Sequence, residues 1–393
     1  MPKKDGTERE SIAAHLQACG YSRRDFLSLC TMLMATAPVG LALTDKTTPE
    51  AVAKTVGKAK RPSVVWLHFQ DCTGCSETLL RTSKPDVASL ILDVISLDYH
   101  ETLMVASGHQ AEAALDQAVK ENAGKFILVV EGSIPKKDGG VYMKLAGKNA
   151  IDVLKEVGSK AAAVVSMGSC ASWGGVPSTP TAGGASPTEA VGVDKIITDK
   201  PVINIPGCPP NPYTLLGVVL EVAALGKVPA LDAEKRPKFA FDRVIHDHCP
   251  RRAHFDAGRF AGSFGDEGHK QGWCLFKLGC KGPVTHASCS TRHFNEVPDC
   301  WPIGIGAPCV GCTEQTIAFK VPIFQTVDVH SFTATPPDGY PLVSGQSGSL
   351  SAIATGLVGL IAGAAGGAAW VAGKKLDEAE SEAPKASAQS GGK

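Results

Sequence analysis

The chain has 393 residues, of which 44% are hydrophobic and 20% charged, as in an ordinary globular protein with room for two modest domains and further segments. Its 39 basic and 39 acidic residues give a formal net charge of zero, so composition does not indicate nucleic acid as a partner. The unusual feature is the 13 cysteines. Two of them, Cys19 and Cys30, precede residue 45, and the remaining odd number argues against a fully paired disulfide framework.

Residues 1–45 have the pattern of an export signal rather than of a folded element. Arg23 and Arg24 stand just before an apolar run from Leu27 to Leu43. Paired arginines before such a run are typical of a twin-arginine signal peptide. We therefore expect the twin-arginine translocase to be a partner. The alternative is an ordinary amphipathic helix at the N-terminus.

Residues 61–230 alternate short apolar runs with helical stretches. The expected strands are Ser63–Phe69, Ile91–Ser96, Lys125–Val130, Ala161–Ser166 and Val202–Ile205. The expected helices are Gly108–Asn122, Ala150–Val157 and Tyr213–Leu225. Strands that alternate with helices predict an α/β domain with a doubly wound, parallel, flavodoxin-like sheet.

Four cysteines follow expected strands of this domain. Cys72 and Cys75 come after the first strand, Cys170 after Ala161–Ser166, and Cys208 after Val202–Ile205. The carboxyl ends of parallel strands form the ligand-binding edge of such a sheet, so these thiols should converge there. Four thiolates suit either a [4Fe–4S] cluster or a zinc ion, and the residues alone leave both open.

Residues 235–335 are different, because regular periodicity is weak and turns are frequent. Seven cysteines crowd this stretch: Cys249, Cys274, Cys280, Cys289, Cys300, Cys309 and Cys312. With few aliphatic runs to form a core, we expect an irregular domain that metal clusters hold together. Together with one histidine, the thiols are enough for two clusters, but spacing does not choose between His246 and His248.

Four basic residues lie among these cysteine loops: Lys277, Lys281, Arg292 and His293. We expect them to be solvated surface charges, with docking of a redox partner as the alternative.

The C-terminal part predicts a membrane anchor. Residues 350–373 form an uncharged stretch, rich in Ala and Gly, that is long enough to cross a bilayer as one helix. Lys374 and Lys375 follow it, which by the positive-inside rule predicts a cytoplasmic C-terminus and a body on the periplasmic side. Residues 374–393 are expected to be a disordered tail. The alternative for 350–373 is a buried core helix.

The loops that carry the cysteines resemble a known family. The stretches are Asp71–Glu77, Gly168–Trp173, Ile205–Pro212, His246–Cys249, Gly272–Cys274, Leu278–Pro283 and Pro308–Cys312. In this order they resemble the signature loops of the small, iron–sulfur subunits of [NiFe] hydrogenases, and most of all the membrane-bound uptake group that includes hydrogenase-2.

The resemblance implies a set of ligands. It assigns a proximal [4Fe–4S] cluster to Cys72, Cys75, Cys170 and Cys208. It assigns a distal [4Fe–4S] cluster to His246, Cys249, Cys274 and Cys280, and a medial [3Fe–4S] cluster to Cys289, Cys309 and Cys312. Cys300 is left over, and we expect it to be an ordinary thiol rather than a fourth medial ligand. Glu77 stands where the family has an acid near the subunit interface, so a proton path is the sharper hypothesis and a capping or salt-bridge carboxylate the plainer one.

The resemblance also implies a function. The chain would relay electrons from H₂ oxidation at the Ni–Fe centre of a large partner subunit. Its acceptor would be a cytochrome b, or a ferredoxin-like subunit with an integral membrane protein. Two alternatives remain: an electron-transfer subunit related to quinone reductases, which would lack the His-x-x-Cys group, and an exported protein stapled by disulfides, which would contain no iron.

Overall fold

The computed structural model describes residues 61–327, except 84–85, 182–183, 294–296 and 298. The expected signal peptide (1–45), membrane helix (350–373) and tail (374–393) lie outside the described residues. Within the described part, no helix has the length and apolar character needed to cross a membrane.

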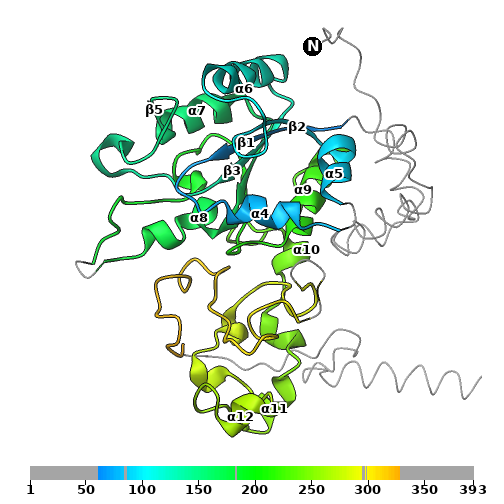
Figure 1. The fold of residues 1–393 in the computed structure, drawn as a ribbon, viewed down its shortest axis with the longest axis vertical. Coiled ribbons are helices and arrows are strands. Elements are labelled where there is room, and N and C mark those ends of the chain that lie inside the picture. The colour runs from blue at the N-terminus through cyan, green and yellow to red at the C-terminus, as the bar shows by residue number, and fades with distance from the viewer. Residues whose placement is uncertain (1–60, 84–85, 182–183, 294–296, 298, 328–393) are drawn as a thin grey trace, which may run out of the picture. The chain divides into compact units, whose positions relative to one another are not determined.

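One five-stranded sheet organises the first half of the described chain (Figure 1). Its strands are β1 (Ser63–His68), β2 (Ser96–His100), β3 (Ile127–Glu131), β6 (Ala163–Met167) and β7 (Val202–Ile205). They are all parallel and lie in the order β2-β1-β3-β6-β7. This is the flavodoxin order, in which the connections reverse direction between β1 and β3. The predicted parallel α/β fold is confirmed.

Helices cover both faces of this sheet. The longer ones are α6 (His109–Glu121), α7 (Ala150–Lys160) and α9 (Pro212–Leu225), and the shorter ones are α4 (Gly74–Leu80), α5 (Val87–Ser89), α8 (Gly168–Trp173) and α10 (Lys238–Phe241). Figure 1 shows α6 and α7 on one side of the sheet and α9 on the other. A two-stranded ribbon of β4 (Lys144–Leu145) and β5 (Lys148–Asn149) precedes α7.

The central strands β1, β3 and β6 are mostly apolar because both of their faces are buried. Successive side chains point to opposite faces of a sheet. Val64 and Trp66 of β1 therefore pack into a core with α9, whereas Val65 and Leu67 pack into a second core with α6 and α7. Two filled cores hold the strand ends rigidly, which is what a precise binding edge requires.

One expected strand is wrong. The pattern predicts a strand over residues 91–96, but a single π-helical turn occupies Leu90–Val94 and β2 begins only at Ser96. An apolar run this short does not by itself distinguish a buried helical turn from a strand. Leu90 and Val94 are buried in this helical turn, as a strand would also have required. The second strand therefore begins later in the sequence than predicted, but it still belongs to the sheet.

Between α10 and residue 327, the described residues form only short helical turns, including α11 (Arg252–Asp256) and α12 (Glu267–Lys270). We call residues 245–327 the cysteine-rich segment. Its core is small, and Cys280 and Cys309 are part of it, packed with Ile245, Leu275 and Trp301. In this small core, thiols therefore take the place that aliphatic side chains have in the two cores of the sheet.

A buried arginine joins the cysteine-rich segment to the sheet. Arg236 is 4% exposed, and its guanidinium pairs with Asp232 at 2.7 Å and with Glu314 at 2.9 Å. It also donates to the carbonyl of Thr313, directly after Cys312. Removing one partner of such a buried ionic group typically costs about 3–5 kcal/mol, so Arg236 holds the loop of Cys312 firmly against the end of the sheet.

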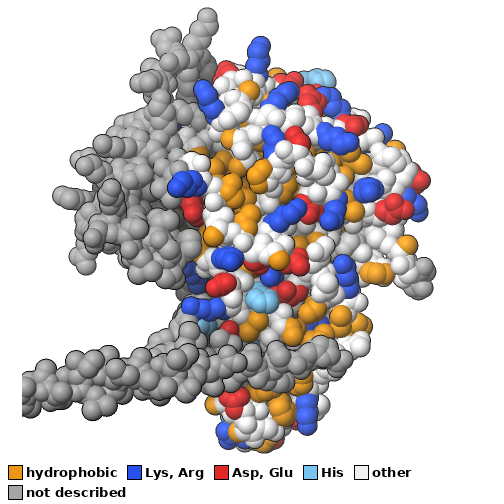
Figure 2. Space-filling model, turned by 180° about the vertical axis from the view of Figure 1, so that it is seen from behind, with side chains coloured by type: hydrophobic (Ala, Val, Ile, Leu, Met, Phe, Trp, Pro, Cys, Tyr) orange, Lys and Arg blue, Asp and Glu red, His pale blue; other side chains and the backbone are white. Residues whose placement is uncertain are grey.

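The surface that Figure 2 shows has no block of a single charge, because acidic and basic side chains are intermixed over the described residues there. This agrees with the balanced composition, and nothing on that face resembles the basic stripe of a nucleic-acid-binding protein.

Candidate metal centres

Four thiols meet at the carboxyl edge of the sheet. Cys72 and Cys75 lie at the turn from β1 into α4, Cys170 in the first turn of α8 after β6, and Cys208 in the loop after β7. The thiolate charges of Cys72, Cys170 and Cys208 all act on Cys75. The structure therefore brings together the four residues that the sequence placed on one edge. We call them the proximal set.

The pKa values of Cys75, Cys170 and Cys208 are raised, so these three thiols do not favour the bare thiolate form. Burial raises the pKa of Cys75 well above its usual value, and Glu131 and the other thiolates raise it further. Burial also raises the pKa of Cys170 to about 12, although the backbone N–H of Val176 partly offsets this. A positively charged metal core would reverse this balance and bind the thiols as thiolates.

A second set surrounds a small cavity in the cysteine-rich segment. His246, Cys249, Cys274 and Cys280 line it together with Phe276 and Arg251. Burial raises the pKa of Cys249 and of Cys274 to about 11 in each case and lowers the pKa of His246. A neutral imidazole is the form that ligates a metal. We call these four residues the distal set.

The cavity also separates the two candidate histidines. His246 lines it, whereas His248 does not, and the Nε2 atom of His248 lies 3.3 Å from the Nη1 atom of Arg243. The ambiguity between His246 and His248 is therefore resolved in favour of His246 as the residue that faces the thiols.

A third set lines a larger cavity between the other two. Cys289, Cys309 and Cys312 line it, with Pro302 also in the wall, and Cys208 of the proximal set reaches it from the sheet edge. Cys300 does not line this cavity, although Trp301 and Pro302 do. Burial raises the pKa values of all three thiols, to about 12 for Cys289. We call these three residues the medial set.

The three sets are connected in series. At one end, the backbone N–H of Cys208 donates to the sulfur of Cys312, and the Ser169 hydroxyl donates to the carbonyl of Cys312. At the other end, the backbone N–H of Cys309 donates to the sulfur of Cys280. The medial set thus touches the proximal set through Cys312 and the distal set through Cys309.

The spacing of the thiols tests zinc against a cluster. A tetrahedral zinc with Zn–S bonds of about 2.3 Å holds its sulfurs about 3.8 Å apart. Among the described residues, the one set of three His, Cys, Asp or Glu ligand atoms that all lie within 4.8 Å of one another is His68, Asp71 and Glu131. No three of the described thiols come that close, so none of the three sets forms a compact tetrahedral zinc site in this structure. The described cysteines also form no disulfide.

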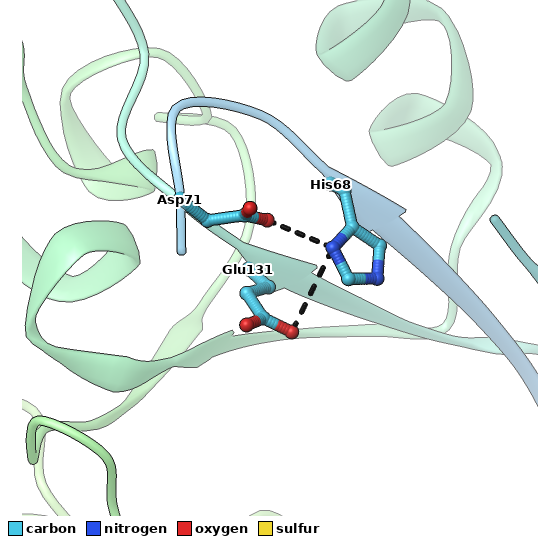
Figure 3. Close-up of side chains that lie close together, drawn as sticks. All are labelled: His68, Asp71 and Glu131. Carbon is cyan, nitrogen blue, oxygen red and sulfur yellow. Dashed lines mark hydrogen bonds and ion pairs between the residues drawn. The ribbon is translucent and has the colours of Figure 1, made fainter. Parts of the chain in front are cut away.

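A buried polar network beneath the proximal set was not among the sequence predictions (Figure 3). His68, at the end of β1, places its Nδ1 atom 2.8 Å from Asp71 and 3.8 Å from Glu131 at the end of β3. Glu131 accepts hydrogen bonds from the backbone N–H of Cys75 at 2.9 Å and from the hydroxyl of Ser76 at 2.6 Å. The carboxylate therefore fixes the turn that carries two ligands.

The two histidines of this network, His68 and His100, have pKa values that are shifted in opposite directions. Burial by itself lowers the pKa of His68, but the hydrogen bond to Asp71 and the charge of Glu131 outweigh it, so the pKa is raised. Burial and the His68 charge lower the pKa of His100 to about 3. A signal was present in the sequence for two of these residues, because His68 and Glu131 are polar residues at the carboxyl ends of apolar strands.

The position of Glu77 does not test its predicted role in a proton path. It is in α4 and pairs with Arg81 one turn later, at 2.7 Å, with both side chains more than half exposed. The structure thus gives Glu77 the salt bridge of the plainer hypothesis, and the proton-path role stays a prediction. Lys281, expected to be solvated, is instead fully buried, so that expectation is wrong.

A parallel α/β sheet with four thiols at its edge, followed by a thiol-rich segment with a histidine, defines an iron–sulfur redox subunit. Comparison with known proteins narrows this class. Residues 72–222 match the family model of the NADH ubiquinone oxidoreductase 20 kDa subunit, and residues 241–325 match that of the C-terminal part of NiFe/NiFeSe hydrogenase small subunits.

Individual relatives agree. The chain is 46% identical to the hydrogenase-2 small chain of Escherichia coli K12, across 91% of this chain and 93% of that one. It is 41% identical to the quinone-reactive Ni/Fe-hydrogenase small chain of Wolinella succinogenes, across 82% and 89%. Among solved structures, the [NiFeSe] hydrogenase of Desulfovibrio vulgaris Hildenborough matches with a TM-score of 0.60 and 37% identity, across 68% of this chain and 98% of that one. The chain therefore belongs to the family of [NiFe] hydrogenase small subunits.

A glycine at the proximal set yields a test of this geometry. Gly168 has φ +91°, and a Cβ atom there would lie 2.5 Å from the sulfur of Cys75. We expect Gly168→Ala to displace Cys75 and to lose roughly a third of the protein's iron, the share of one four-iron cluster among three. Iron and acid-labile sulfide analysis of the purified protein measures this.

The matched control is Gly147→Ala. Gly147 also has a positive φ, +81°, but no atom lies within 4 Å of the position of its Cβ. It carries the same backbone strain without the contact to sulfur, so its iron content should be normal. A full complement of iron in Gly168→Ala would contradict the placement of Cys75.

Proposed function

We propose that this chain is the electron-relay subunit of a [NiFe] hydrogenase. It takes electrons from H₂ oxidation at the Ni–Fe centre of a large partner subunit and passes them through three iron–sulfur clusters to a quinone or cytochrome chain in the membrane. The observation that carries this proposal is the serial contact of three thiol sets, from the sheet edge through the medial set to the distal set.

Each set has the donors for one cluster. We propose that the proximal set binds a [4Fe–4S] cluster, that the distal set of one imidazole and three thiolates binds another, and that the three medial thiolates bind a [3Fe–4S] cluster. When bound, the clusters accept and release single electrons. The residues supply the path: the amide of Cys208 and the amide of Cys309 bridge consecutive sets, and Ser169 holds the first bridge closed.

The distal imidazole has a chemical consequence. A neutral His246 in place of a thiolate leaves the distal centre less negative, which favours the reduced state. That suits a site from which electrons leave the protein.

The leading alternative is a subunit related to quinone reductases. The match of residues 72–222 to the NADH ubiquinone oxidoreductase subunit model reflects a shared proximal-type sheet. The match of residues 241–325 to the hydrogenase C-terminal model favours hydrogenase, because that part carries the distal and medial sets.

We propose the following organisation for the whole chain. Residues 1–45 are a twin-arginine signal, 61–230 a flavodoxin-like domain, 235–335 an iron–sulfur domain, 350–373 a single membrane helix and 374–393 a cytoplasmic tail. The body then faces the periplasm beside the large subunit, and a cytochrome b or a ferredoxin-like subunit with an integral membrane protein takes the electrons. The quinone-reactive relative in Wolinella succinogenes supports a membrane acceptor.

The direct test is H₂-dependent reduction of a viologen dye, measured anaerobically on the complex that co-purifies from membranes with this chain carrying an affinity tag. We expect dye reduction, and a nickel-containing large subunit in the complex. Cys208→Ser should abolish most of the activity, because Cys208 belongs to the proximal set and also bridges to Cys312. Iron without hydrogen activity, in a complex that holds a mature large subunit, would favour the quinone-reductase alternative.

Cys300 tests the type of the medial cluster. Because Cys300 does not line the medial cavity, Cys300→Ser should keep the EPR signal of an oxidised [3Fe–4S] cluster at its full intensity. Cys289→Ser is the control and should lose that signal, because Cys289 is a cavity thiol. If Cys300→Ser instead created a [3Fe–4S] signal that the unaltered protein lacks, Cys300 would be a fourth ligand.

A further inference from the structure

Lys281 is fully buried, which is unusual for a lysine and sets it apart among the described residues. Its relative exposure is 0%, and it directly follows Cys280 of the distal set. The ammonium group of lysine is strongly hydrated and is rarely buried without a partner. Among the described residues, no carboxylate forms an ion pair with it.

The hydrogen-bond partners of Lys281 match those of an ammonium group. Its Nζ atom lies 2.8 Å from the carbonyl oxygen of Ile323, 3.0 Å from that of Pro322 and 3.4 Å from that of Gly279. An ammonium group offers three N–H donors, one for each carbonyl. A neutral amine has two donors and a lone pair that would face the third oxygen. Three acceptors around one nitrogen therefore match the donors of the charged form.

The charge lies beside both thiol sets of the cysteine-rich segment. Lys281 directly follows Cys280, and its side chain packs against Gly311 in the loop between Cys309 and Cys312. Burial lowers the pKa of Lys281 overall, and the thiolates of Cys309 and Cys280 offset this only in part. The charge of Lys281 in turn lowers the pKa of Cys280. Cys280 belongs to the distal set and Cys309 to the medial set, so one cation acts on both.

Contacts hold Lys281 at both its backbone and its side chain. Its backbone N–H donates to the carbonyl of Cys309 at 2.9 Å, and its own carbonyl accepts from the hydroxyl of Thr285 at 2.6 Å. The aliphatic part of the side chain packs closely against Gly311: if this glycine had a Cβ atom, it would lie 3.2 Å from the Cδ atom of Lys281. Both ends of the residue are thus held, and its charge is fixed relative to the two sets.

We propose that Lys281 is a built-in electrostatic tuning residue that raises the reduction potentials of the medial and distal centres relative to the proximal centre. This inference rests on the proposed assignment of clusters to the three sets. Reduction adds one electron, and hence one negative charge, to a centre. A fixed positive charge in surroundings of low dielectric constant stabilises that added charge strongly. Because the charge acts on the medial and distal sets, it favours electron flow away from the proximal end.

The test is an anaerobic potentiometric titration of the hydrogenase complex, followed by EPR, for Lys281→Gln. Glutamine keeps two N–H donors for the carbonyls and removes the charge. We expect both the medial and the distal midpoint potentials to shift to lower values, while the proximal potential stays unchanged. Lys281→Arg keeps a positive charge and should shift them much less than Lys281→Gln.

Lys277→Gln is the matched control. Lys277 is on the same loop, four residues earlier, but it is exposed and lies over the ring of Phe260. Solvent screens such a charge, so the same substitution should leave all three potentials nearly unchanged.

The outcomes separate this inference from the proposed function. Cluster signals with unchanged medial and distal potentials in Lys281→Gln would overturn the tuning role and leave the relay intact. Loss of these two signals in Lys281→Gln and in Lys281→Met, with retention in Lys281→Arg, would show that the charge assembles the centres rather than tunes them, and would also overturn it. Absence of cluster signals from the unaltered protein would reject the proposed function itself.

Discussion

The crowding of buried thiols is the constraint on which the rest of this structure depends. Thiolates that are desolvated and close together destabilise one another, and the raised pKa values of Cys75, Cys170 and Cys309 express that cost. Disulfides would remove the cost, but the described cysteines form none. A metal–sulfide core removes it in another way, by supplying positive charge where the thiols meet. Folding of the cysteine-rich segment is then coupled to binding of its clusters.

The sheet and the cysteine-rich segment differ in how far they depend on a cluster for stability. The sheet has two complete apolar cores, so its edge can present the proximal set without relying on a cluster for stability. The cysteine-rich segment has one small core that includes Cys280 and Cys309 themselves. Its position relative to the sheet edge depends on polar anchors, chiefly Arg236 with its two carboxylates and Ser169 with the carbonyl of Cys312. These anchors keep the medial set in contact with the proximal set.

A relay needs more than ligands, because the order of potentials decides where electrons go. With the proposed assignment of clusters, three features of the chain would act on that order: Glu131 beneath the proximal set, His246 of the distal set and the buried Lys281 between the medial and distal sets. A carboxylate near the first set and a cation near the other two act in the same direction. Electrostatics of the protein would therefore favour electron movement from the sheet edge toward the distal set.

The sequence was sufficient for the parts of the fold that depend on local pattern. Apolar runs identified β1, β3, β6 and β7, and the cysteines that follow three of these strands do meet at one edge. The pattern was insufficient at Leu90–Val94, because a short buried run satisfies a helical turn as well as a strand. Burial of charged residues was also out of reach, since it depends on distant partners. Lys281 is buried by carbonyls some forty residues away, and Glu131 by the turn of Cys75.

Mössbauer spectroscopy of the ⁵⁷Fe-labelled complex tests the central claim, that three metal centres of two types lie in series in this chain. The account predicts two [4Fe–4S] components and one [3Fe–4S] component per chain, or about eleven iron atoms besides the iron of the Ni–Fe centre. A colourless, iron-free chain with disulfides, or one in which zinc occupies the proximal thiols, would contradict it.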